Sequence, residues 1–230
     1  MNPKFLLSCI LLTSMLVGCN LTSSTMVPTT MSTTAPTLEF VDSTPIQPIS
    51  PTQPIILIPA LPSSIQQAVL DRATEVIALI KAKDLITLSN YIHPMDGLRF
   101  SPYAFVNATD QVFPADEVAS LLADSTVYSW GTFSGSGASI DITFANYYSK
   151  FIYDVDFANA PQLALNHRLG VSTSLDNSHE FYPGAMIVEY YFPGFDPQFE
   201  GLDWRSLRLV FLEENNTWYL VCLIHDQWTT

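Results

Sequence analysis

The residues best suited to acid–base chemistry lie near the C-terminus of the chain. His225 and Asp226 close an apolar run, and Asp203 stands just before the preceding run. An imidazole titrates near neutral pH, and a neighbouring carboxylate can orient the ring and stabilise its protonated form. The sequence therefore gives one candidate catalytic pair, His225 with Asp226 or Asp203. The alternative is a structural histidine whose ring bonds to a loop backbone, and the lack of any nucleophile motif favours it.

A second group of side chains could contact a ligand. Arg205 could bind a carboxylate with both arms of its guanidinium, or it could form an internal ion pair with Asp203 or Asp226. Trp130 could line a ligand cup, although aromatic residues in strands often belong to the core. The complete predicted ligand-binding set consists of residues near strand ends or adjoining loops: His93, Arg99, Trp130, Arg205 and His225.

Other polar residues suggest structure rather than chemistry. Glu189 and Arg208 are lone charges in apolar runs. Glu189 is expected to pair with an arginine, with a cavity carboxylate as the alternative, and Arg208 is expected to be solvated or to form a cross-strand pair. Asp154-Val155-Asp156 with Asn159 resembles a calcium loop only faintly, because it lacks the glycine turn and the terminal glutamate. No cysteine and histidine cluster has zinc spacing. The sequence therefore predicts no metal site and no cofactor.

The charge of the chain excludes some partners. The 230 residues carry 9 Lys+Arg against 22 Asp+Glu, for a formal net charge of -13. Tracking of a nucleic-acid backbone needs clustered Lys and Arg, so we expect no nucleic-acid partner. With 48% hydrophobic residues the chain can still bury a core.

The N-terminal segment has the pattern of a lipoprotein signal. Lys4 precedes an apolar stretch, 5–17, that is too short to span a bilayer as a helix and suits a signal peptide. The stretch ends in Leu-Val-Gly-Cys, which resembles the lipobox. We therefore predict that residues 1–18 are a signal peptide and that Cys19 carries the lipid. The alternatives are an ordinary secretory signal or an uncleaved anchor.

This prediction places the protein on the extracytoplasmic face of a cell membrane, which it contacts through the lipid on Cys19. Because Asn20 is not aspartate, the outer membrane is favoured if the source has two membranes. The next stretch, 19–62, is rich in Ser, Thr and Pro, and proline at this density blocks helices and sheet ladders. We interpret it as a tether, in which 55–58 could dock on the domain as an edge segment.

The remainder, 63–230, is predicted to be one α+β domain. Apolar residues at helical spacing predict a helix from Ser63, Asp84 and Thr143 are expected helix N-caps, and a short helix is expected after Pro114. From Leu163 onward the pattern is that of strands, with candidates at 162–168, 185–192, 205–213 and 218–226. The last two are expected to form a hairpin. Helices followed by antiparallel strands are typical of α+β folds.

This order of elements, with a last strand that contains Trp-Tyr-Leu-Val, looks like the NTF2-like (cone-shaped α+β) fold. Several stretches also resemble a family of uncharacterised bacterial lipoproteins: 93–94, 99–103, 128–131, 192–197, 203–211 and 225–229. The resemblance covers most of 65–229. It implies an anchored domain and carries no assigned reaction.

Three functions remain open at this level. A tethered domain that binds a small ligand or an envelope partner is the leading hypothesis, because a concave sheet offers an apolar cup with a few polar groups. The second is a small acid–base enzyme, of dehydratase, isomerase or hydrolase type, that uses His225. The third is an interaction protein without a small-molecule site, whose binding surface would include the aromatic loop 192–199.

Overall fold

The structure is a computed structural model that describes residues 55–57 and 63–229. The predicted signal peptide, Cys19 and all but three residues of the predicted tether lie outside these residues. Among the described residues, no helix is long and apolar enough to cross a membrane.

One long helix and several short helical turns precede or interrupt the strands. The long helix, α1, buries Val69, Ala73, Val76 and Ile80, whose spacing places them on one face. The expected caps are confirmed, since Asp84 accepts a hydrogen bond from the Thr87 amide. The helical elements are α1 (Ser63–Ala82), α2 (Leu85–Leu88), η1 (Ser89–Tyr91), α3 (Ala115–Val118), η2 (Leu121–Ala123), α4 (Phe144–Tyr147), η3 (Tyr148–Ile152), η4 (Phe157–Asn159), α5 (Ser178–Phe181) and η5 (Pro197–Phe199).

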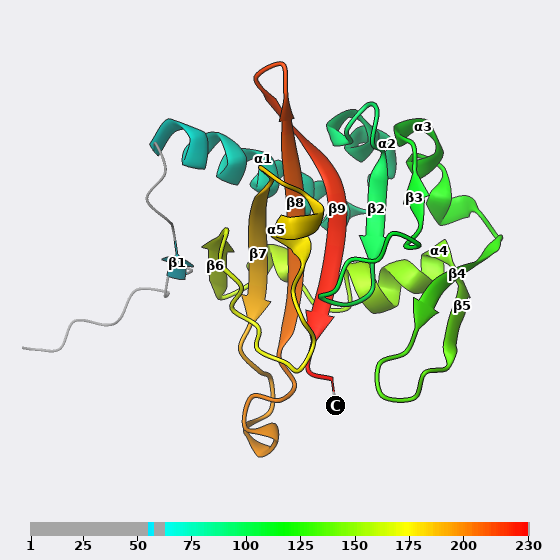
Figure 1. Ribbon diagram of the computed structural model, residues 1–230, viewed down its shortest axis with the longest axis vertical. Coiled ribbons are helices and arrows are strands. Elements are labelled where there is room, and N and C mark those ends of the chain that lie inside the picture. The colour runs from blue at the N-terminus through cyan, green and yellow to red at the C-terminus, as the bar shows by residue number, and fades with distance from the viewer. Residues whose placement is uncertain (1–54, 58–62, 230) are drawn as a thin grey trace, which may run out of the picture. The chain divides into compact units, whose positions relative to one another are not determined.

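Seven of the described strands form one sheet in the order β1-β6-β7-β8-β9-β2-β3, and β4 pairs with β5 apart from it. The pairs β1–β6 and β2–β9 are parallel, whereas the other pairs are antiparallel. This confirms an α+β fold with a mostly antiparallel sheet (Figure 1). The strands are β1 (Ile55–Leu57), β2 (Leu98–Ser101), β3 (Val112–Phe113), β4 (Val127–Thr132), β5 (Ser139–Thr143), β6 (Gln162–Leu165), β7 (Met186–Phe192), β8 (Arg205–Glu214) and β9 (Thr217–Gln227).

The predicted hairpin between β8 and β9 is confirmed, but it contains a bulge that the sequence does not signal. Val210 pairs with Cys222 and Phe211 with Leu220, so Val221 is an extra residue on β9. A bulge of this kind shifts the alternation of the strand by one position. His225 therefore shares its face with Leu220 and not with Val221, contrary to the simple alternation expected from the sequence.

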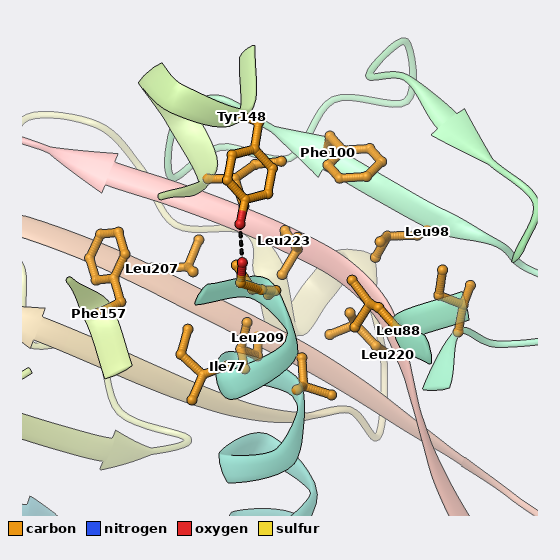
Figure 2. Close-up of a cluster of buried hydrophobic side chains, with 14 of the residues drawn as sticks. Ile77, Leu88, Leu98, Phe100, Tyr148, Phe157, Leu207, Leu209, Leu220 and Leu223 are labelled. Atoms are coloured by element: carbon orange, nitrogen blue, oxygen red, sulfur yellow. Dashed lines mark hydrogen bonds between the residues drawn. The ribbon is translucent and has the colours of Figure 1, made fainter. Parts of the chain in front are cut away.

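The helical elements α1, α4 and η3 cover one face of the sheet. Ile77 of α1 packs toward Leu207, Leu209 and Leu223 of the central strands (Figure 2). The hydroxyl of Tyr148 donates a hydrogen bond to the Ile80 carbonyl, which ties η3 to the end of α1. This face holds most of the buried apolar residues of the domain.

The opposite face carries a smaller core and most of the buried charges. Ile187, Val210, Val221 and Cys222 form an apolar cluster against which Phe181 and Tyr182 pack. The segment 166–178, which follows β6 and leads into α5, lies over the rest of this face. One face of the sheet is therefore mainly apolar, whereas the other holds most of the buried charges. The surroundings of each predicted site residue depend on which face it occupies.

Candidate functional site

The structure separates the predicted catalytic pair. His225 and Asp226 are neighbours on β9 and point to opposite faces of the sheet, so they cannot act together. Asp203 is not beside His225 either, because its carboxylate accepts hydrogen bonds from the amides of Phe195 and Asp196. The carboxylate next to His225 is that of Asp154, with 3.4 Å between Nε2 and Oδ1. The pairing of His225 with Asp226 or Asp203 is corrected accordingly.

The environment of His225 does not suit proton transfer to a substrate. The residue is 0% exposed, and its ring packs edge-on against Phe151. Neither ring nitrogen has a hydrogen-bond partner among the described residues, and His225 lines neither the open cleft nor the filled space between helices and sheet described below. A general base must come within roughly 2.6–3.2 Å of the proton it removes. The surroundings of His225 are those of a buried structural residue.

Arg205 completes this buried group. Its Nε donates to Asp154 at 3.0 Å, and its Nη1 donates to the carbonyls of Asp203 and Trp204. Burial raises the pKa of Asp154, but the neighbouring His225 and Arg205 outweigh burial and leave that pKa below its ordinary value. Arg205 is thus an internal ion-pair partner, although its partner is Asp154 and not Asp203 or Asp226.

Asp226 belongs to a buried ionic cluster on the opposite face. Its carboxylate lies 2.7 Å from Nη2 of Arg168 and 3.7 Å from Nη2 of Arg208. Arg208 also reaches Asp176, with 2.6 Å between Nη1 and Oδ2. Glu189 lies opposite Arg208 in the strand register. We refer to these five residues as the buried ionic cluster.

The cluster holds the segment 166–178 against the sheet. Arg168 donates to the Ser174 carbonyl as well as to Asp226, and Glu189 accepts hydrogen bonds from the Leu169 amide and the Ser206 hydroxyl. Buried charges retain their ionised form only when paired and hydrogen-bonded. Each member therefore has a structural partner, and the cluster serves to fix this segment.

The carboxyl groups of the cluster respond to pH in opposite directions. Burial raises the pKa of Glu189 and of Asp226 despite their hydrogen bonds and arginine neighbours. For Asp176, burial is outweighed by the charge of Arg208, and the pKa falls to about 2. As pH falls, a group whose pKa is raised in the folded state takes up its proton there first, which favours the folded state. A group whose pKa is lowered in the folded state takes up its proton first in the unfolded state, which favours unfolding.

We therefore expect the free energy of unfolding to increase as pH falls from neutral toward the ordinary carboxyl range, and to decrease below it. Glu189 and Asp226 contribute to the increase, as does the buried Asp110. Asp176 and Asp156 contribute to the decrease between their ordinary pKa of 3.8 and about 2. Urea unfolding at a series of pH values measures this profile. Glu189→Gln should flatten the increase, and a variant profile that superposes on the native one would refute the assignment.

The other predicted ligand residues do not meet at one cavity. His93 lies where β9 begins, at the end of the sheet opposite His225; its Nδ1 accepts a hydrogen bond from the Asp96 amide, and its ring contacts Tyr219. The space between helices and sheet, where the sequence predicts a cup, is filled by side chains including Ile80, Leu98 and Phe100 and leaves no room for a water molecule. Of the predicted set, Trp130 alone is among the described residues that line the open cleft considered next.

That cleft has a volume of about 410 Å³ and lies between the loop after β2, the end of β4 and the segment 166–178. Its walls combine aromatic rings, hydroxyl groups, an amide and one carboxylate: Pro102, Tyr103, Phe105, Asn107, Thr109, Asp110, Trp130, Gly131, Thr132, Ser134 and Ser174. None of these described lining residues is Lys, Arg or His. The cleft falls within the 300–1,000 Å³ range of small-molecule sites.

Arg99 supports the loop that forms one wall of the cleft. Its Nη1 donates to the carbonyls of Asn107, Ala108 and Asp110, and its Nε donates to the Tyr182 hydroxyl. These bonds fix the loop 102–110, which carries six of the lining residues. Arg99 is therefore a positioning residue of the cleft and does not itself line it.

Asp110 supplies the charged group of the cleft wall. It is 8% exposed, and its Oδ2 accepts a hydrogen bond from the Asn107 amide at 2.9 Å. Burial raises the pKa of Asp110, and that hydrogen bond and the charge of Arg99 offset burial only in part. Trp130 is also buried, stacked on Tyr147 with 3.9 Å between ring centroids, and its Nε1 donates to the Ile142 carbonyl. These two residues give the cleft a rigid base.

The sequence does not reveal most of this site. Asn107, Thr109 and Asp110 form a short polar run between predicted elements, which reads as an ordinary loop. They become a site only because β2 inserts beside β9 and the β4–β5 hairpin packs opposite the loop. The run of polar residues that follows the strand of Arg99 is the sequence feature that could have indicated the cleft.

Among the described residues, no group of three His, Cys, Asp or Glu side chains lies close enough together to hold a metal ion. The faint calcium motif is divided between two structural roles. Asp154 binds Arg205, whereas Asp156 binds Lys81, Tyr153 and Asn159.

Comparison with known proteins adds little to this description. No protein-family model matches the chain, and no curated protein matches it. A solved structure described as a calcium/calmodulin dependent protein kinase II association domain from Xanthomonas campestris is similar over 78% of this chain and 97% of that chain, with 11% identity and a TM-score of 0.31. A likeness at this level carries no information about ligand or assembly.

Proposed function

We propose that this chain is a lipid-anchored extracytoplasmic protein whose single domain binds a small polar ligand in the cleft between the loop 102–110 and β4. The observation that carries the proposal is the cleft itself, which combines about 410 Å³ of space with a buried carboxylate at Asp110. Function is assigned from this site and not from the fold, because one fold supports many functions.

The lining limits the chemistry of the ligand. Hydroxyl and amide groups of Asn107, Thr109, Thr132 and Ser134 can exchange hydrogen bonds with a polar molecule, and the rings of Tyr103 and Phe105 offer apolar contact. A single carboxylate without a lining cation repels anions, and the net charge of -13 adds to that repulsion. Neutral or cationic ligands fit best.

The anchor in this proposal rests on the sequence, since Cys19 lies outside the described residues. A short apolar stretch that ends in Leu-Val-Gly-Cys, followed by a Pro-rich tether, supports processing and lipidation at Cys19. We also propose that the domain is NTF2-like. The long α1 against one face of a curved, mostly antiparallel sheet supports this assignment, although the space between them is filled by core residues.

A substitution that fills the cleft tests the proposal. Ser134→Trp places a large ring in the cleft wall and should abolish retention of any ligand that co-purifies with the native protein, as measured by native mass spectrometry. Ser134 contributes only its backbone amide to a hydrogen bond with Tyr103, so the fold should tolerate the change.

The matched control is Ser136→Trp, which adds the same ring to an exposed position of the same hairpin that does not line the cleft. This control should retain the ligand at the native level. Equal retention in both variants, or equal loss in both, would show that the ligand does not occupy the cleft.

A further inference from the structure

Exposed apolar side chains gather at one end of the domain. Of the twelve large hydrophobic residues that are exposed among the described residues, six lie where β7 ends, β8 begins and β9 ends: Val171, Leu175, Phe195, Phe199, Leu202 and Trp228. We call these six residues the apolar end. Exposed apolar residues scattered singly need no explanation, but a group of them marks an interaction surface.

Hydrogen bonds and chain connections bring these residues together. The loop 193–204 joins β7 to β8 (Figure 1). Strand β9 runs antiparallel to β8 with Gln227 paired to Arg205, so Trp228, the next residue, lies at the same end. Thr173 and Ser174 bond to Thr229, which brings the exposed Val171 and Leu175 close to it. The apolar end is therefore built from three separate stretches of chain.

The loop 193–204 is well ordered by its own contacts. Asp203 accepts hydrogen bonds from two loop amides, Asp196 caps η5 through the Gln198 amide, and the rings of Phe192 and Phe195 stack at 5.2 Å. Despite this order, Phe195 and Phe199 remain 52% and 56% exposed. Exposure of these two aromatic rings to water is unfavourable in free energy, and contact with an apolar partner would remove that cost.

The first described residue of the predicted tether, Ile55, lies at this same end. Ile55 begins β1 and pairs with Gln162, which pairs with Tyr191 next to the end of β7. Ile55 is therefore at the end of the sheet where β7 leads into the loop of Phe195 and Phe199. In the sequence, 35 residues, 20–54, separate it from the predicted lipid at Cys19.

We propose that the apolar end contacts the lipid bilayer to which Cys19 is attached. This inference rests on the proposed lipid anchor, which would keep the domain close to the membrane and supply a high local lipid concentration. Phe and Trp side chains are suited to the interface between headgroups and acyl chains. The loop 193–204 has no Lys or Arg and exposes Glu200, so the contact depends on apolar insertion and not on attraction to anionic lipid.

Oxidative footprinting of the lipidated full chain tests the proposal. The protein is reconstituted into phosphatidylcholine vesicles at about one chain per vesicle and compared with the soluble Cys19→Ala chain. Labelling of Phe195, Phe199 and Trp228 should slow by about threefold or more in vesicles, because insertion removes these rings from water. Labelling of Met95, which is 83% exposed at the opposite end of the sheet, should not change.

A paired substitution makes the outcome decisive. Phe195→Ser with Phe199→Ser should return Trp228 labelling to its rate in solution while the lipid still holds the chain on vesicles. Ile86→Ser with Met95→Ser should leave the protection of Trp228 intact. Equal labelling in vesicles and in solution would overturn the docking, as would protection that appears only at many chains per vesicle, which indicates self-association. A wild-type chain whose mass shows no lipid would instead refute the anchor.

Discussion

Replacing Arg208 with Met is expected to lower the free energy of unfolding by about 3–5 kcal/mol, the range measured when one partner of a buried ion pair is removed. Arg208 is almost fully buried and pairs with Asp176 and Asp226, while Glu189 lies opposite it in the strand register. Methionine fills similar space but leaves these carboxylates with one cation fewer. Urea unfolding measures the loss through the transition midpoint at constant slope.

Arg72→Met is the matched control for this prediction. Arg72 is half-buried, forms an ion pair with the exposed Glu75 at 3.7 Å and lies over the Tyr91 ring, and such surface contacts contribute about 0–1 kcal/mol each. Adding Glu189→Gln to Arg208→Met should recover part of the lost stability, because it removes a buried carboxyl group whose ionisation Arg208 no longer offsets. If Arg208→Met lost no more stability than Arg72→Met, the buried ionic cluster would not support the fold as described.

Replacing Cys19 with Ala is expected to move the protein from the membrane fraction to the soluble fraction, or to leave an unprocessed precursor. The thiol is the predicted point of lipid attachment, and each buried methylene of an acyl chain contributes about 0.8 kcal/mol of membrane affinity. Loss of several chains therefore removes nearly all of the binding. Cell fractionation, followed by the intact mass of the mature chain, measures the change.

Cys222→Ala provides the control, since this thiol is buried in the core and should not affect localisation. Burial also raises the pKa of the Cys222 thiol far above its ordinary value, which keeps it unreactive. A Cys19→Ala chain that stayed in the membrane fraction after signal cleavage would contradict the anchor. The apolar end alone is not expected to hold the domain there, because its contact is secondary to the lipid.

Local rules predict most of the secondary structure of this chain. Thr143 caps α4 as its sequence context predicts, and the two adjacent asparagines between β8 and β9, Asn215 and Asn216, adopt the left-handed conformation that a tight hairpin needs. The segment at 55–57 docks as an edge strand, as expected. These features depend on side chains within a few residues of each other, which is why they can be read from sequence.

The arrangement of the site depends on contacts between distant parts of the chain. The extra residue at Val221 reverses the alternation of β9 before His225, and no sequence rule locates such a bulge. The pairing of His225 with Asp154 joins residues 71 positions apart, whereas the sequence suggests neighbours. The cleft likewise combines Asp110, Trp130 and Ser174 from three segments. Residue types point to candidates, but only tertiary packing decides which of them meet.

Ligand binding in the cleft is tested most directly by a crystal structure of the protein isolated from its native membrane without exchange of bound ligand. We expect non-protein electron density in the cleft of about 410 Å³, in contact with Asp110 and with the rings of Tyr103 or Phe105. Density for a bound molecule at any other place, with only ordered water in the cleft, would contradict it.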